Sequence, residues 1–126
     1  MSHRFYKCNK CGNIYEVVKD SGCQVSCCGI PMEEIIPGAV NASEEKHVPV
    51  VTEDGSKVKI RIGSEKHPMV TDHYIEWISI DTKEGIQRKD LSPESEPEAV
   101  FFLGEDDELI NAYAYCNLHG LWKTEL

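Results

Sequence analysis

Four cysteines in the first quarter of the chain restrict what this part of the sequence can fold into. They form one CxxC pair and one adjacent pair: Cys8, Cys11, Cys27 and Cys28. A segment of about 36 residues cannot bury enough apolar surface to be stable unaided, so it needs a crosslink. Four thiolates around one ion would make a closed tetrahedral site, as for zinc or a single iron. We therefore expect residues 1–36 to form a small metal-bound domain.

Two alternatives remain open for these cysteines. Thiolate ligands suit both zinc and iron, so the residues do not distinguish the two metals. Disulfides would also crosslink the segment, for example through a vicinal Cys27–Cys28 bond. The sixth cysteine, Cys23, precedes Cys27 by four residues. It is interpreted as a free thiol on a loop, or as an alternative ligand or an oxidation-sensitive partner of the adjacent pair.

Composition and charge narrow the classes of function. The chain has 126 residues, 40% of them hydrophobic, and a formal net charge of −9. This acidity argues against a nucleic acid as partner, because no basic stripe offsets repulsion by phosphate. No apolar run approaches the roughly 18 residues needed to span a bilayer, and the first residues contain no secretion signal. We therefore expect a cytoplasmic protein without membrane contact, in which clustered thiols bind metal.

The rest of the chain, residues 37–126, has the pattern of a β-sandwich. Residues 31–44 contain three Pro or Gly breaks and are interpreted as a linker. About seven short β-like runs follow at spacings typical of sandwiches, with turn signals between them. They are residues 47–51, 57–62, 73–80, 85–91, 98–103, 109–115 and 121–125. No convincing helix interrupts them, so the fold class is expected to be mainly β, with an immunoglobulin-like sandwich as the larger domain.

A second set of metal-ligand residues lies in this sandwich region. Cys116 and His119 are three residues apart and can bind one ion from a single turn. The other candidates are His47, His67 and His73, each where a loop meets an apolar or β-branched run. Five ligands are more than tetrahedral zinc takes, and four imidazoles in a plane with a thiolate on one side would leave the other side open. An open position on a redox-capable metal indicates catalysis.

Less specific interpretations compete with this one. A lone histidine in a β protein is usually a surface residue or a hydrogen-bonded core residue. The histidines would then line a second structural site, and the chain would be an electron-transfer or structural zinc or iron protein without catalysis. Metal content and colour distinguish these classes, because zinc is colourless and ferric thiolate centres absorb visible light.

The motifs together resemble the desulfoferrodoxin family, the two-iron form of superoxide reductase. The resemblance covers the whole chain and rests on CxxC–x15–CC near the start and on EKHVP, HPM, HYIEW and CNLHGLW later. It implies a desulforedoxin-like domain over residues 1–36 with iron bound by the four cysteines. Over residues 37–126 it implies a superoxide reductase domain with a square-pyramidal iron. There His47, His67, His73 and His119 would lie in the plane and Cys116 would be the axial ligand.

The resemblance also implies a reaction and partners. The family reduces superoxide to hydrogen peroxide with one outside electron, supplied by rubredoxin-type donors, and forms homodimers. It assigns Lys46 the attraction of superoxide and Glu45 the sixth ligand position of the resting ferric site. From the residues alone, this EEK run reads as a solvated loop. We further expect the backbone amides of Asn117 and His119 to lie near the Cys116 sulfur.

Overall fold

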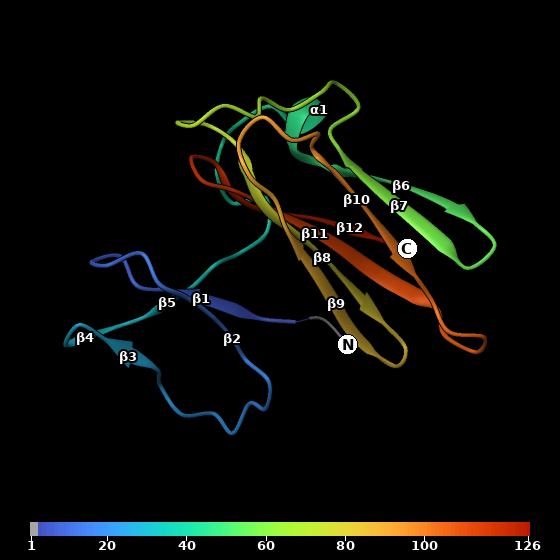
Figure 1. Ribbon diagram of the computed structural model, residues 1–126. Coiled ribbons are helices and arrows are strands. Elements are labelled where there is room, and N and C mark those ends of the chain that lie inside the picture. Colours follow the sequence, from blue (N-terminus) through green and yellow to red (C-terminus); the bar gives the residue numbers. More distant parts are fainter. Residues whose placement is uncertain (1–2) are drawn as a thin grey trace. The chain divides into compact units, whose positions relative to one another are not determined.

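The computed structural model describes residues 3–126, and the chain divides into two compact units, Met1–Ile36 and Pro37–Leu126. The regular elements are β-strands apart from one short helix among residues 3–126, which confirms the predicted mainly β fold class (Figure 1). Within the described residues, no helix is long and apolar enough to cross a membrane.

The larger unit is a sandwich of two antiparallel sheets. Its elements are α1 (Glu44–His47), β6 (Pro49–Asp54), β7 (Lys57–Ile62), β8 (Ile75–Thr82), β9 (Gly85–Asp90), β10 (Glu98–Phe102), β11 (Leu109–Cys116) and β12 (Gly120–Glu125). One sheet has the order β10-β7-β6 and the other β12-β11-β8-β9. The first, second and fifth strands of the sandwich thus share one sheet. This distribution is that of immunoglobulin-type sandwiches with a fourth strand added to the second sheet.

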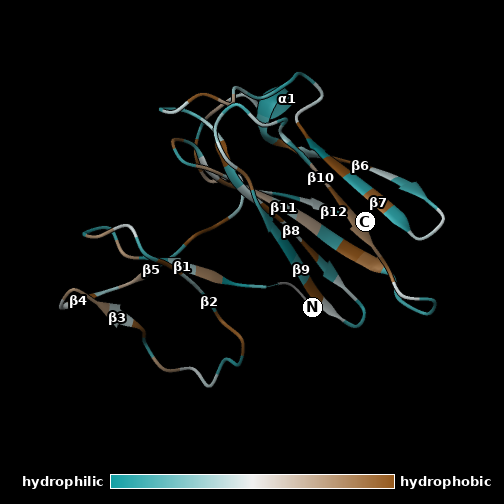
Figure 2. Cartoon of the chain, in the orientation of Figure 1, coloured by the Kyte–Doolittle hydropathy of each residue, from teal (hydrophilic) through white to brown (hydrophobic). Residues whose placement is uncertain are grey.

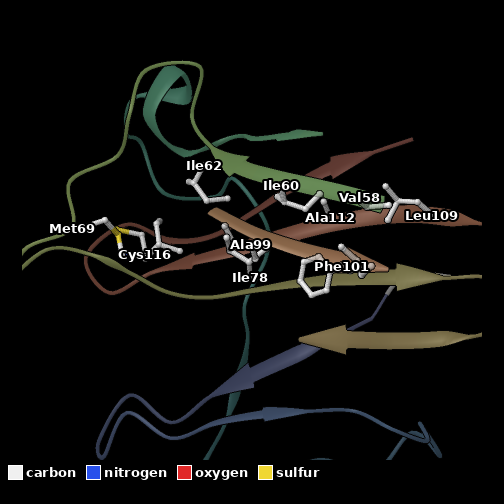
Figure 3. Close-up of a cluster of buried hydrophobic side chains, with 13 residues drawn as sticks. Val58, Ile60, Ile62, Met69, Ile78, Ala99, Phe101, Leu109, Ala112 and Cys116 are labelled. Atoms are coloured by element: carbon white, nitrogen blue, oxygen red, sulfur yellow. The ribbon is translucent and has the colours of Figure 1, made fainter. Parts of the chain in front are cut away.

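Alternation in β7 shows why these residues form a strand with one face in the core. Val58, Ile60 and Ile62 are completely buried, whereas Lys59 and Arg61 between them are exposed. The hydropathy of β7 alternates accordingly along the strand (Figure 2). Strand side chains point alternately to opposite faces, so the apolar set meets the other sheet. The buried apolar side chains of the larger unit form one core cluster. Met69 and Cys116 lie at one end of this cluster and Leu109 lies at the other (Figure 3).

The seven strands of the larger unit correspond to the seven runs expected from the sequence. The expectation of no helix was wrong for residues 44–47, which form the single turn α1. A four-residue helix is too short for a period to be visible in the sequence. Its last hydrogen bond, from the Val48 backbone N–H to the Glu44 carbonyl, is 3.0 Å long.

Residues 3–36, the part of the smaller unit that the structure describes, contain five very short strands. They are β1 (Phe5–Lys7), β2 (Ile14–Glu16), β3 (Ser26–Cys27), β4 (Ile30–Pro31) and β5 (Glu33–Glu34). The sheets have the orders β2-β1-β5 and β3-β4. The interpretation of residues 31–44 as a linker was therefore wrong at its start, because β5 pairs with β1. Two-residue strands have no alternation from which they could be recognised.

Candidate metal centres

The four cysteines of the smaller unit form one cluster. The sulfurs of Cys8, Cys11, Cys27 and Cys28 all lie within 4.8 Å of one another. The Cys11 and Cys27 sulfurs are 3.6 Å apart, and those of Cys27 and Cys28 are 3.9 Å apart. Metal–sulfur bonds of about 2.3 Å put tetrahedral sulfurs about 3.8 Å apart, so the cluster fits one ion. All six cysteines are free thiols, so the disulfide alternative is not observed.

Backbone hydrogen bonds shape the CxxC turn for anionic sulfur. The Gly12 N–H donates to the Cys8 carbonyl at 2.8 Å, and the Cys11 N–H points at the Cys8 sulfur at 3.4 Å. This amide lowers the pKa of Cys8 to about 6, while hydrogen bonding with Cys11 raises the pKa of Cys27 to about 12. The thiols thus share protons that a cation would displace. Cys23 is exposed and lies outside the cluster.

The second ligand set comes from three segments at one end of the sandwich (Figure 1). The helix α1 carries Glu45, Lys46 and His47, and the loop between β7 and β8 carries His67 and His73. Cys116 is the last residue of β11, and the turn between β11 and β12 carries His119. Donor atoms of His47, His67, His73 and Cys116 lie within 4.8 Å of one another. The His119 Nδ1 lies 3.2 Å from the His47 Nε2 and 3.9 Å from the Cys116 Sγ.

The four imidazole rings form a square. Going around it, neighbouring ring centroids are 4.7 Å apart for His47–His67, 4.7 Å for His67–His73, 5.1 Å for His73–His119 and 4.9 Å for His119–His47. Each of these pairs is near perpendicular, with interplanar angles of 74–88°. The His47–His73 diagonal is 6.5 Å. Four rings turned edge-on to one centre are the arrangement of equatorial ligands around a single ion.

Hydrogen bonds fix which nitrogen of each buried ring faces this centre. His47 Nδ1 lies 2.6 Å from the Ser43 carbonyl, and His67 Nδ1 lies 2.6 Å from the Pro68 carbonyl. A carbonyl only accepts, so both Nδ1 atoms donate and both Nε2 atoms carry a lone pair in the neutral ring. These two Nε2 atoms face each other at 3.2 Å.

Facing lone pairs repel, and a cation between them removes the repulsion. Adjacent nitrogens bound to a planar centre at about 2.1 Å lie about 3.0 Å apart, close to the observed separation. The His73 Nε2 is also buried and has no hydrogen-bond partner among residues 3–126. Burial lowers the pKa of His67 to about 4 and also lowers the pKa values of His47 and His73. These three imidazoles are therefore neutral at pH 7 and suited to binding a metal ion.

Cys116 supplies the one sulfur at this centre and is completely buried. Burial raises the pKa of its thiol, and the backbone N–H groups of His119 and Leu118 oppose this increase. The expectation that the Asn117 amide serves this sulfur was wrong, because the Asn117 N–H donates to the Tyr74 carbonyl at 3.2 Å. The backbone N–H of Leu118 therefore acts on the Cys116 sulfur in place of the Asn117 N–H.

Close backbone approach at Gly63 holds α1 in place. The Gly63 N–H donates to the Val48 carbonyl, and the Glu65 N–H donates to the Glu45 carbonyl at 2.9 Å. Gly63 has φ +82°, and a Cβ there would lie 2.2 Å from the Glu65 carbonyl oxygen and 2.7 Å from that of Glu45. Only glycine fits this position. Sequence reasoning missed Gly63, because a glycine after a strand gives no sign of what its backbone touches.

Trp122 on β12 contacts the ring of His47 and the backbone of His119. Its indole stacks on His47 with centroids 4.8 Å apart and an interplanar angle of 25°. The indole N–H donates to the His119 carbonyl at 3.1 Å. Trp122 is 4% exposed and therefore limits access of water to this side of the centre.

The two side chains expected to serve the reaction, Glu45 and Lys46, are both exposed on α1. The Ser43 hydroxyl donates to the Glu45 carboxylate at 2.7 Å, and this bond lowers the pKa of Glu45. The Lys46 charge contributes to the lowered pKa values of His47 and His73, so it acts on two rings of the square. Neither side chain is a member of the ligand cluster.

A cluster of four thiols on a small β unit and a square of imidazoles over a buried thiol define a metalloprotein with two mononuclear centres. Comparison with known proteins agrees with this class. The model of the desulfoferrodoxin family matches residues 39–125, and that of the desulfoferrodoxin N-terminal domain matches residues 2–35. The chain belongs to the desulfoferrodoxin family, and its two ligand sets are consistent with two iron centres.

Individual relatives cover nearly the whole chain. A desulfoferrodoxin homolog of Archaeoglobus fulgidus is 45% identical over 119 residues, which are 94% of each protein. The desulfoferrodoxin of Nitratidesulfovibrio vulgaris is 42% identical over 123 residues, covering 98% of this chain and 96% of that protein. The crystal structure of the superoxide reductase from Treponema pallidum matches with a TM-score of 0.83 at 36% identity. The match covers 99% of this chain and 100% of the Treponema pallidum chain.

Proposed function

We propose that this protein is a superoxide reductase, which converts superoxide, one electron and two protons into hydrogen peroxide. The observation that carries the proposal is the square of four imidazoles whose ring nitrogens lie close together beside a buried thiol. Family membership and the similarity to the Treponema pallidum superoxide reductase support it.

In this proposal the second iron would be held by the imidazoles of His47, His67, His73 and His119 and by the thiolate of Cys116. The first iron is held by Cys8, Cys11, Cys27 and Cys28, so that residues 1–36 are a desulforedoxin-like domain and residues 37–126 the catalytic domain. The second iron, when bound, supplies a one-electron reductant with an open position, made more electron-rich by the thiolate. Burial keeps the imidazoles neutral and ready to bind it.

Lys46 and Glu45 have different roles in this proposal. Lys46 places a positive charge near the square, and among residues 3–126 the structure shows no ion pair to its ammonium group. It is thus available to attract superoxide. Glu45 is held by the Ser43 hydroxyl, and we assign it the sixth ligand position of the oxidised resting state. Its carboxylate would exchange that hydroxyl for the metal.

The electron has to come from outside, because reduction of superoxide without formation of dioxygen consumes one electron in each turnover. We propose a rubredoxin-type protein as the donor, a homodimer as the assembly and the cytoplasm as the location. The free thiols agree with a reducing compartment.

Product stoichiometry tests the proposed reaction. The iron-loaded protein with a reductant should form one peroxide for each superoxide consumed, with no dioxygen. A dismutase would form half as much peroxide, together with dioxygen. Metal analysis and a visible spectrum before and after ferricyanide should show two irons in each chain. A colourless zinc protein, obtained from a host supplied with iron, would instead indicate a structural role.

Replacing Lys46 by alanine should slow the second-order reaction with superoxide by about tenfold at low salt, the scale of local steering. Screening restricts charge effects to roughly 8 Å at physiological salt, so a cation beside the centre outweighs remote carboxylates. Lys46→Arg should retain most of the rate. Lys57→Ala makes the same change in net charge at the far end of β7 and serves as control. Pulse radiolysis measures these rates, and a wild-type rate for Lys46→Ala would exclude steering.

Replacing Cys11 by serine should damage the first centre and leave most superoxide reduction intact, because the substrate meets only the second centre. The visible spectrum follows the first centre, and pulse radiolysis follows the reaction. A loss of activity as complete as that of His119→Ala would show that the two centres do not act independently.

A further inference from the structure

Asn117 makes three hydrogen bonds with the loop that carries His73. Its Oδ1 accepts from the Tyr74 backbone N–H at 2.9 Å, and its Nδ2 donates to the Asp72 carbonyl at 3.0 Å. Its own backbone N–H donates to the Tyr74 carbonyl at 3.2 Å. These three hydrogen bonds, called here the Asn117 clamp, hold the residues directly before and after His73.

His73 depends on this support more than the other buried rings do. Each of the His47 and His67 rings is oriented by a hydrogen bond from its own Nδ1 to a carbonyl at 2.6 Å. Within residues 3–126, no hydrogen bond reaches either ring nitrogen of His73. The direction of its ring is therefore set by the backbone, through the Val70–His73 bridge and the Asn117 clamp.

The chemistry of the amide explains why asparagine suits this position. A planar carboxamide presents one acceptor and two donors, so it can pair with an N–H and a carbonyl of the same strand segment. A carboxylate would place an acceptor against the Asp72 carbonyl, and an aliphatic side chain would leave both backbone groups unpaired. Asn117 also stands directly after Cys116, so its clamp joins the segment with the axial sulfur to the segment with His73.

We propose that Asn117 is a positioning residue for the second metal centre, which directs His73 at the ion through the backbone on both sides of it. The inference depends on the proposed role of His73 as a ligand, and it does not depend on superoxide being the substrate. Partners that orient a metal ligand typically contribute about 10–100-fold to metal affinity. We expect Asn117→Ala to weaken metal binding at the second centre by about tenfold, within that range.

A double-mutant cycle on the full-length chain tests this, with cobalt(II) as the probe. The ligand-field spectrum of cobalt bound by four sulfurs differs from that of cobalt bound by four nitrogens and one sulfur. Cobalt binding at the second centre is therefore followed separately from binding at the first. Competition with a chelator of known affinity gives the dissociation constant. Asn117→Ala should weaken binding about tenfold in the wild-type and His67→Ala backgrounds, and less than about twofold in the His73→Ala background.

The matched control is Thr71→Ala, which changes an exposed side chain of the same loop and should leave cobalt affinity unchanged. Equal losses from Asn117→Ala in all three backgrounds would overturn the inference, because Asn117 would then act on the fold in general. An unchanged affinity in Asn117→Ala would overturn it as well. If His73→Ala itself binds cobalt normally, His73 is not a ligand and both the clamp and the proposed ligand set fail. Peroxide stoichiometry is measured separately, so failure of the reaction assignment is distinguishable.

Discussion

Replacing Cys116 by serine is expected to abolish the thiolate-to-iron charge-transfer band of the oxidised second centre and to leave the spectrum of the first centre intact. Cys116 is the one sulfur among the second set of donors, and it is completely buried. A serine hydroxyl is a harder and poorer ligand, so iron loses both the band and the electron density that the thiolate supplies. Loss of a residue that only supports a metal ligand typically lowers affinity by about 10–100-fold. Because Cys116 is proposed as a ligand itself, we expect affinity for iron to fall by roughly a hundredfold, the upper end of that range.

The control for this variant is Cys23→Ser, which also removes one thiol. Cys23 is exposed and lies outside both clusters, so both spectra and the rate of superoxide reduction should remain as in the parent. Visible spectroscopy and metal analysis on the same samples separate loss of the band from loss of iron. A band that survives in Cys116→Ser at full iron content would show that another group is the axial ligand.

Replacing Gly63 by alanine should produce the largest loss of stability. A Cβ would meet the Glu65 and Glu45 carbonyl oxygens at 2.2 and 2.7 Å, and φ of +82° disfavours any L side chain. Backbone strain and overlap each cost about 1–3 kcal/mol, so we expect a loss of about 3 kcal/mol or more. For a unit of this size that lowers the Tm by roughly 15 °C. Because Gly63 holds α1, iron at the second centre should also be lost.

Gly55→Ala provides the matched control, because Gly55 lies in the turn at the other end of β7. Gly55 also has a positive φ, of +62°, but no atom lies within 4 Å of the added Cβ. The backbone penalty alone should cost about 1 kcal/mol and leave the metal centre unchanged. Thermal unfolding and iron content of the two variants therefore isolate the contact at Gly63. Equal losses in the two variants would show that the approach to α1 contributes nothing.

The large features of the fold were predictable because they rest on repeated patterns. Alternation as in Val58, Ile60 and Ile62 identifies a strand without knowledge of its neighbours. The turn residues between the strands then indicate the sandwich. The short helix α1 and the two-residue strand β5 were missed, because neither is long enough to show a period. Both are stabilised by contacts with distant segments, such as the pairing of β5 with β1.

The candidate site was predictable in its residue types and less so in its support. Cysteine and histidine are recognisable by their chemistry, and the structure brings all nine candidate ligands into two groups. The supporting contacts are backbone contacts, which the sequence does not display. The Asn117 backbone N–H was expected at the Cys116 sulfur but serves Tyr74, because the exact path of a tight turn depends on the segment packed against it.

The square of histidines draws its members from segments separated by 20 to 72 residues, as the His47–His67 and His47–His119 pairs show. A partly folded chain offers a metal ion only isolated imidazoles, and each of them competes with water for the ion. We therefore expect high metal affinity at the second centre only after β11 and β12 have paired and α1 has docked on the turn at Gly63. Selection of the metal would then be delayed until folding is complete, and a redox-active ion would be bound tightly only by molecules that already present all of its ligands.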